Sequence, residues 1–305
     1  MPLKIPKTLP AVEALRNENI FVMDSERAES QEIRPLKILI INLMPLKVTT
    51  ETDLIRLLSN SPLQMEVDFL RMSSHTPKHT PIEHMMEFYK SFDVIRQSNY
   101  DGMIVTGAPV EHLPFEEVKY WKELQRIFDW AQTHVTSTFY ICWAAQAGLY
   151  HFYGIPKYPL SEKIFGVYEH SVFDKLNPIF RGFDDVFYVP HSRHTEIRRD
   201  DILKVQELTL LSESPESGVY MVMARSGRDI FITGHSEYSP YTLDAEYKRD
   251  VKKGLSIHLP ENYYRDNNPK NEPVVRWRSH ANLLFTNWLN YFVYQETPYD
   301  LTKIG

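Results

Sequence analysis

The chain has 305 residues, 43% hydrophobic and 24% charged, which is the balance of an ordinary globular protein with room for one large α/β domain. A net charge of −6 argues against a nucleic-acid-binding surface, and no apolar run approaches the ~18 residues that span a membrane. A single cysteine excludes an intramolecular disulfide and a thiolate metal site, and the N-terminus carries no apolar leader, which together predict a protein of the reducing cytoplasm.

Residues 1–35 carry prolines and mixed charge, which predicts an N-terminal arm or a short helix laid on the surface. From residue 36 onward, apolar runs alternate with amphipathic segments, and this alternation predicts an α/β fold with an open, mostly parallel sheet and helices on both faces, of the flavodoxin-like kind. We expect strands at 36–43, 65–71, 102–106 and 137–142, and helices at 50–59, 116–133 and 143–153.

The second half of the chain is richer in short β-type runs, at 164–170, 186–189, 208–212, 219–224 and 229–234. Two further helices are expected at 244–253 and 274–294. No repeat or low-complexity linker divides residues 36–305, so one domain is expected. The sequence also contains neither G-x-G-x-x-G nor a P-loop, which removes the usual signals of a dinucleotide or phosphate cradle.

Cys142 is the only cysteine, and it ends a buried strand immediately before an alanine-rich helix. The positive end of a helix dipole favours the thiolate, which is the nucleophilic form of cysteine. A free cysteine is also often a buried, inert residue, so this position alone does not establish catalysis.

A base for such a nucleophile is offered by His235, with Glu237 two residues further along. Positions i and i+2 of an extended chain project to the same side, so one short segment can present both an imidazole and a carboxylate. The carboxyl ends of strands in an open α/β sheet converge on one crevice, where Cys142 and His235 can meet. The sequence therefore favours nucleophilic catalysis.

An acyl-transfer site also needs amide donors for the oxyanion. The N–H of Trp143, directly after the nucleophile, is one expected donor, and the turn after the strand at 102–106 offers a second from Val110. His75, His79 and His84 have loosely ligand-like spacing, but prolines break any common helix face, so no metal site is expected.

Five segments resemble the homoserine O-acyltransferases of methionine biosynthesis, often labelled homoserine O-succinyltransferases. They are NLMPLK at 42–47, TGAPVE at 106–111, YICWAAQAG at 140–148, PHSRH at 190–194 and GHSEYSP at 234–240. The resemblance runs from about residue 36 to 294 and implies the fold of the class I glutamine amidotransferases, in which a cysteine at a strand–helix elbow meets a histidine and a glutamate.

The resemblance implies that Cys142 forms an acyl thioester, with His235 as general base and Glu237 as its orienting partner. Lys163, Ser192 and Arg249 match positions that bind the substrates in the family. The implied partners are L-homoserine and an acyl-CoA, with no further cofactor, no nucleic acid and no membrane, and a homodimer is left open.

The acyl donor is tied by the resemblance to Glu111, because glutamate at the matching position goes with acetyl-CoA and glycine with succinyl-CoA. The physics agrees, since two carboxylates ~4 Å apart repel by up to ~4 kcal/mol at an effective dielectric near 20. We therefore expect a homoserine O-acetyltransferase. A succinyltransferase, a glutaminase-like Cys-His-Glu hydrolase and a non-catalytic binding protein on the same fold are the alternatives.

Overall fold

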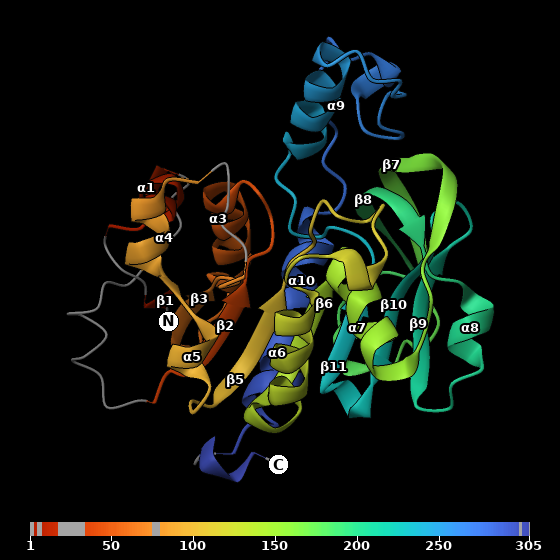
Figure 1. The fold of residues 1–305 in the computed structure, drawn as a ribbon. Helices are drawn as coiled ribbons and strands as arrows, with labels where there is room; N and C mark the ends of the chain where they lie inside the picture. Colours follow the sequence, from red (N-terminus) through yellow and green to blue (C-terminus); the bar gives the residue numbers. More distant parts are fainter. Residues whose placement is uncertain (1–2, 5–7, 18–33, 75–79, 299–300, 305) are drawn as a thin grey trace.

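The computed structural model describes residues 3–4, 8–17, 34–74, 80–298 and 301–304. Within these ranges, one sheet carries its strands in the order β1-β3-β2-β5-β6-β11-β10-β9-β7-β8, and β4 pairs with β3 (Figure 1). The strands of the parallel part are β1 Leu3–Lys4, β2 Leu36–Ile41, β3 Met65–Leu70, β4 Tyr89–Lys90, β5 Tyr100–Val105, β6 Val135–Ile141 and β11 Asp229–Ile232.

An antiparallel extension continues the sheet beyond β11. It consists of β10 Gly218–Ala224, β9 Leu208–Ser214, β7 Tyr158–Val172 and β8 Val186–Glu196. The mostly parallel sheet expected from the sequence is confirmed, and the β-rich runs of the second half form its antiparallel end.

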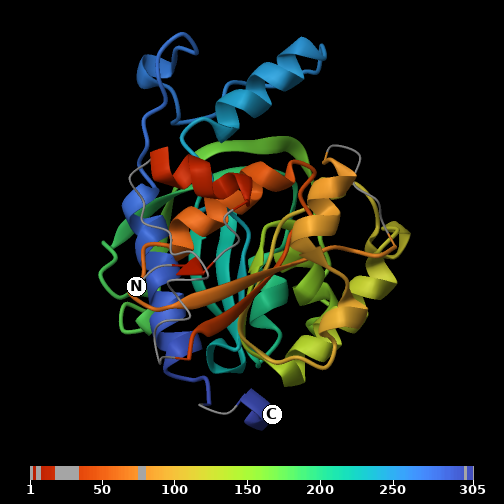
Figure 2. The same cartoon turned by 90° about the vertical axis from the view of Figure 1, so that its left-hand side faces the viewer.

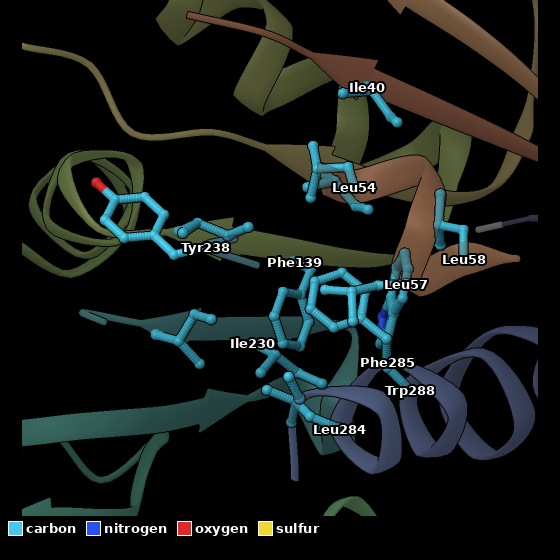
Figure 3. Close-up of a cluster of buried hydrophobic side chains, with 14 of the residues drawn as sticks. Ile40, Leu54, Leu57, Leu58, Phe139, Ile230, Tyr238, Leu284, Phe285 and Trp288 are labelled. Atoms are coloured by element: carbon cyan, nitrogen blue, oxygen red, sulfur yellow. The ribbon is translucent and has the colours of Figure 1, made fainter. Parts of the chain in front are cut away.

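Helices cover both faces of the sheet. Buried side chains of α1 Pro10–Asn17, α3 Lys47–Leu58, α4 Ile82–Phe88 and α10 Arg278–Asn287 form one hydrophobic cluster. Those of α5 Phe92–Ile95, α6 Trp121–His134, α7 Trp143–Tyr153 and α8 Arg199–Leu203 belong to the other cluster. Figure 3 shows part of the first cluster, where Leu54 and Leu58 of α3 face the same core as Phe139 of β6 and Phe285 of α10.

The helix α9, Thr242–Lys252, stands apart from these layers. In both views it lies at the top of the molecule, at the opposite end from the C-terminus (Figures 1 and 2). Short helical turns complete the fold: η1 Phe115–Glu117, η2 Pro178–Phe180, η3 Arg225–Gly227, η4 Arg265–Asn267 and η6 Leu301–Lys303, with a π-helical turn, η5, at Trp288–Tyr294.

The described parts of the N-terminal arm share the sheet and core of the domain. β1 pairs with β3 in parallel, and Leu9, Ala11 and Val12 are buried in the cluster that contains α3. Residues 18–33 lie outside the described residues.

Two expected helices begin later than the sequence suggested. The prediction of a helix from residue 116 is wrong at its start, because η1 ends at an extended Val118 and α6 begins at Trp121. The prediction of a helix from residue 274 is wrong in the same way. The N–H of Val274 donates to the carbonyl of Tyr263, which keeps this segment outside the helix until Arg278.

Candidate active site

Cys142 occupies a sharp elbow between β6 and α7. Its backbone has φ 53° and ψ −114°, a conformation that strains any residue other than glycine and persists only where the surroundings enforce it. The enforcing contact is a hydrogen bond from the Cys142 N–H to the carbonyl of Ile232 on β11, at 2.7 Å. The elbow places the thiol at the N-terminus of α7, where the helix dipole favours negative charge.

His235 follows β11 and is fixed on three sides. Its N–H donates to the carbonyl of Pro190 on β8 at 2.8 Å, and its Nδ1 lies 2.7 Å from Oε1 of Glu237. Its ring stacks on Tyr238 with 4.1 Å between centroids. With Nδ1 engaged by the carboxylate, Nε2 is left for the side-chain hydrogen bond that His235 shares with Cys142. The structure therefore brings Cys142, His235 and Glu237 together in the order expected.

The charge state of this group follows from its contacts. Burial alone would lower the pKa of His235, but the neighbouring Cys142 and Glu237, by charge and by hydrogen bonding, hold that pKa well above its usual value. The raised pKa favours the protonated, imidazolium form of His235. Among the described residues, Oε2 of Glu237 is buried without a hydrogen-bond partner, and Glu237 is one of the residues that line a cavity of about 890 Å³.

Gly107 closes the site opposite the elbow. A Cβ at this position would lie 3.3 Å from Cβ of Cys142 and 3.4 Å from Cε1 of His235. The loop that follows carries Val110, whose N–H donates to the carbonyl of Ala108 at 2.9 Å. That contact must open before Val110 can donate to an oxyanion, whereas Trp143 follows the nucleophile at the first position of α7.

The three expected substrate-binding residues gather beside this group. Ser192 donates to Oε2 of Glu246 at 2.6 Å, and Nζ of Lys163 lies 3.3 Å from the same oxygen. Arg249 donates twice to Asp250, at 2.7 and 3.0 Å, and Lys163 lies 4.0 Å from Asp250. The two carboxylates of α9, Glu246 and Asp250, thus contact both cations and the one hydroxyl that the sequence singled out.

Glu246, Asp250 and Tyr238 were missed by sequence reasoning. Tyr238 donates to Oε1 of Glu246 at 3.2 Å while its ring stacks on His235, so it joins the group around Glu246 to the group of Cys142, His235 and Glu237. The available signal was the four-residue spacing of Glu246 and Asp250, which places both carboxylates on one face of a helix.

The loop that carries Glu111 is held by a lysine. Nζ of Lys157 donates to the carbonyl oxygens of Glu111 and Leu113. Burial raises the pKa of Glu111, and a hydrogen bond from the His194 N–H together with the charges of nearby cations, Lys163 among them, opposes that rise. The carboxylate therefore lies within electrostatic reach of the catalytic group.

The structure also bears on metal binding. His84, which the sequence grouped with His75 and His79, lies 3.0 Å from Oε1 of Glu51, while His75 and His79 fall outside the described residues. A different set, Glu111, His112 and His194, presents three ligand atoms within 4.8 Å of one another.

No helix among the described residues is long and apolar enough to cross a membrane.

The chain is similar to known proteins over nearly its whole length. The family model described as homoserine O-succinyltransferase matches residues 2–299. A homoserine O-acetyltransferase of Phocaeicola vulgatus is 69% identical over the whole of both chains, and one of Parabacteroides distasonis is 70% identical over all of this chain and 99% of that protein. Another, from Desulfitobacterium hafniense, is 58% identical.

Among solved structures, the fold is similar to that of a glutamine amidotransferase from Thermotoga maritima. The TM-score is 0.56 at 14% identity, over 84% of this chain and 98% of the other. A glutamine amidotransferase from Methylobacillus flagellatus gives a TM-score of 0.52 at 12% identity, over 85% and 95%. These likenesses show the class I glutamine amidotransferase fold.

Proposed function

The chain belongs to the homoserine O-succinyltransferase family, and from that premise we propose that it transfers an acetyl group from acetyl-CoA to the hydroxyl of L-homoserine, in methionine biosynthesis. The observation that carries the proposal is the Cys142–His235–Glu237 arrangement with the carboxylate of Glu111 beside it. The names of the relatives at 69% and 70% identity support the choice of donor.

The reaction proceeds by double displacement through Cys142. The thiolate attacks the acetyl carbonyl of acetyl-CoA, the oxyanion forms against the N–H of Trp143, and the C–S bond to CoA breaks. His235, protonated in the resting site, gives its proton to the departing CoA thiolate. The neutral imidazole then takes the proton of the homoserine hydroxyl as that oxygen attacks the thioester, and collapse of the adduct returns the thiolate and imidazolium.

The acceptor binds at the group beside α9. The ammonium of homoserine is complementary to the carboxylate of Glu246, and its carboxylate to the cations Lys163 and Arg249. A guanidinium holds a carboxylate through two parallel hydrogen bonds, the geometry that Arg249 now makes with Asp250. Ser192 completes the site as a donor next to Glu246.

Glu111 selects the donor. A succinyl tail would bring a second carboxylate against this half-buried one, and even ~1.4 kcal/mol of repulsion gives a tenfold preference for acetyl-CoA. The side chain also fills volume that a longer acyl tail needs. This feature, rather than the succinyl name of the family, supports acetyl transfer.

We further propose that acetyl-CoA enters as a co-substrate and that no cofactor takes part, since the Cys142–His235–Glu237 group supplies every proton and nucleophile the reaction needs. A cytoplasmic location fits a chemistry that depends on one reduced thiol.

Intact-protein mass spectrometry without acceptor tests the first half-reaction. Acetyl-CoA should add one acetyl group to the wild type and none to Cys142→Ala, whereas succinyl-CoA should add little. An acetylated Cys142→Ala protein, or near-full turnover by that variant, would mean direct transfer without a thioester.

Steady-state kinetics then tests the donor. With homoserine saturating, kcat/KM should strongly favour acetyl-CoA, and Glu111→Gly should shift the ratio at least ~10-fold toward succinyl-CoA. A wild type that prefers succinyl-CoA, or a ratio that Glu111→Gly leaves unmoved, would show that Glu111 is not the selector.

A further inference from the structure

Three metal-ligating side chains meet beside the active site, from two distant parts of the chain. Glu111 and His112 lie on the loop after β5, and His194 lies on β8; one ligand atom of each falls within 4.8 Å of the others. The rings of His112 and His194 are 4.6 Å apart between centroids. The catalytic mechanism uses neither histidine ring.

Two imidazoles and one carboxylate suit Zn²⁺, which binds nitrogen and oxygen donors at about 2.0–2.2 Å with four ligands. Tetrahedral bonds of that length put the ligand atoms about 3.4 Å apart, so ligand atoms that now lie within 4.8 Å of one another must close by up to about 1.4 Å. His112 is exposed, while Glu111 and His194 are half-buried, and the carboxylate of Glu111 accepts a hydrogen bond from the backbone N–H of His194. The three protein ligands leave a fourth position for water.

The local electrostatics allow a cation to bind here. Two lysines near the site are engaged by other groups, which reduces their repulsion on an arriving metal ion. Lys163 is paired with Glu246 at 3.3 Å and lies 4.0 Å from Asp250, and Lys157 donates to the carbonyl oxygens of Glu111 and Leu113.

We propose that Glu111, His112 and His194 form a zinc-binding site, and that Zn²⁺ bound there reversibly inhibits acyl transfer. The metal would draw the Glu111 carboxylate out of its present position and occupy the space beside the acyl group. The binding half of this inference stands on the ligand geometry, while the inhibitory half rests on the proposed function.

Binding is measured first by calorimetric titration of Zn²⁺ into Cys142→Ala protein, because a thiol beside a histidine is itself a zinc ligand pair. We expect one site, whose affinity for Zn²⁺ falls at least ~10-fold in His112→Gln and in His194→Gln. A loss of this size is typical even for residues that only hydrogen-bond to a metal ligand. The matched control is His134→Gln, which removes a histidine at the C-terminal end of α6. If the three variants bind Zn²⁺ with equal affinity, or if no binding is detected at all, the proposed zinc site is wrong.

Inhibition is measured on the enzyme with Cys142 intact. Zn²⁺ should slow acetyl transfer and a chelator should restore it, while His112→Gln should keep the zinc-free rate and lose at least ~10-fold in sensitivity to zinc. Zinc bound at this site with undiminished transfer would overturn the inhibitory role and leave the site standing. Absence of acetyl transfer without zinc would count against the proposed function, and the calorimetric result does not depend on it.

Discussion

Replacement of Gly107 by alanine should damage catalysis more than stability. The new Cβ would lie 3.3 Å from Cβ of Cys142 and 3.4 Å from Cε1 of His235, closer than ordinary carbon contacts. Neither neighbour yields easily, because each holds a backbone hydrogen bond to a strand, 2.7 Å to Ile232 and 2.8 Å to Pro190. A displacement of a few tenths of an ångström between nucleophile and base should lower kcat/KM by ~3–10-fold, given that ~1 Å costs about 10²-fold.

The free energy of unfolding should fall by only about 1–3 kcal/mol, the usual cost of one extra methyl in a packed interior. Gly102→Ala is the matched control, since its Cβ would meet Ile38 at 3.0 Å and Trp288 at 3.1 Å, in the core and away from the thiol. It should lose similar or greater stability in urea while keeping kcat/KM. Equal activity of Gly107→Ala and wild type, or equal losses in both variants, would refute the reasoning that Gly107 sets the distance between Cys142 and His235.

Three further outcomes are expected. Glu237→Gln removes a charge that raises the pKa of His235, so alkylation of Cys142 by iodoacetamide near pH 8 should slow by ~10-fold; unchanged alkylation would mean that the carboxylate does not sustain the imidazolium. Lys157→Met removes the hydrogen bonds that hold the Glu111 loop, so the ratio of kcat/KM for acetyl-CoA to kcat/KM for succinyl-CoA should fall by ~10-fold. Replacement of the exposed Lys119 by methionine should leave this ratio unchanged. Burial lowers the pKa of His170 to about 3, so the unfolded chain gains a proton below pH ~6.5 that the folded chain refuses. The contribution of His170 to the free energy of unfolding, measured in urea, should therefore be fully present above pH ~6.5. At pH 5 that free energy should be lower by up to ~2 kcal/mol because of this histidine, and the loss should be smaller in His170→Gln.

Local sequence information was sufficient for the elements around the nucleophile. The helix predicted at 143–153 matches α7, because an alanine-rich run lies between the turn at Cys142 and a left-handed glycine at Gly154. The i, i+2 spacing of His235 and Glu237 likewise predicted a pair that the structure places 2.7 Å apart. In each case the determining contacts lie within a few residues.

Contacts between distant segments could not be predicted in the same way. The helix α9 reads as a solvated charged helix, and only the approach of β7 and β8 gives Glu246 its partners Lys163 and Ser192. His194 joins Glu111 and His112 for the same reason, since the order of β8 in the sheet is not encoded in any local pattern. The N–H of Val110 was expected to be available, but a turn specific to this loop engages it.

In the mechanism that we propose, Glu246 would join recognition of the acceptor to the geometry of the base. One oxygen of its carboxylate accepts from Ser192 and lies near Lys163, while the other accepts from Tyr238, whose ring stacks on His235. An ammonium group that binds to this carboxylate must share or replace those donors, and any shift of Tyr238 is transmitted to the imidazole through a 4.1 Å ring contact. If the acceptor binds at Glu246 as we propose, the residues that bind it also fix the orientation of its general base. We then expect a poorly fitting acceptor to weaken deprotonation as well as binding.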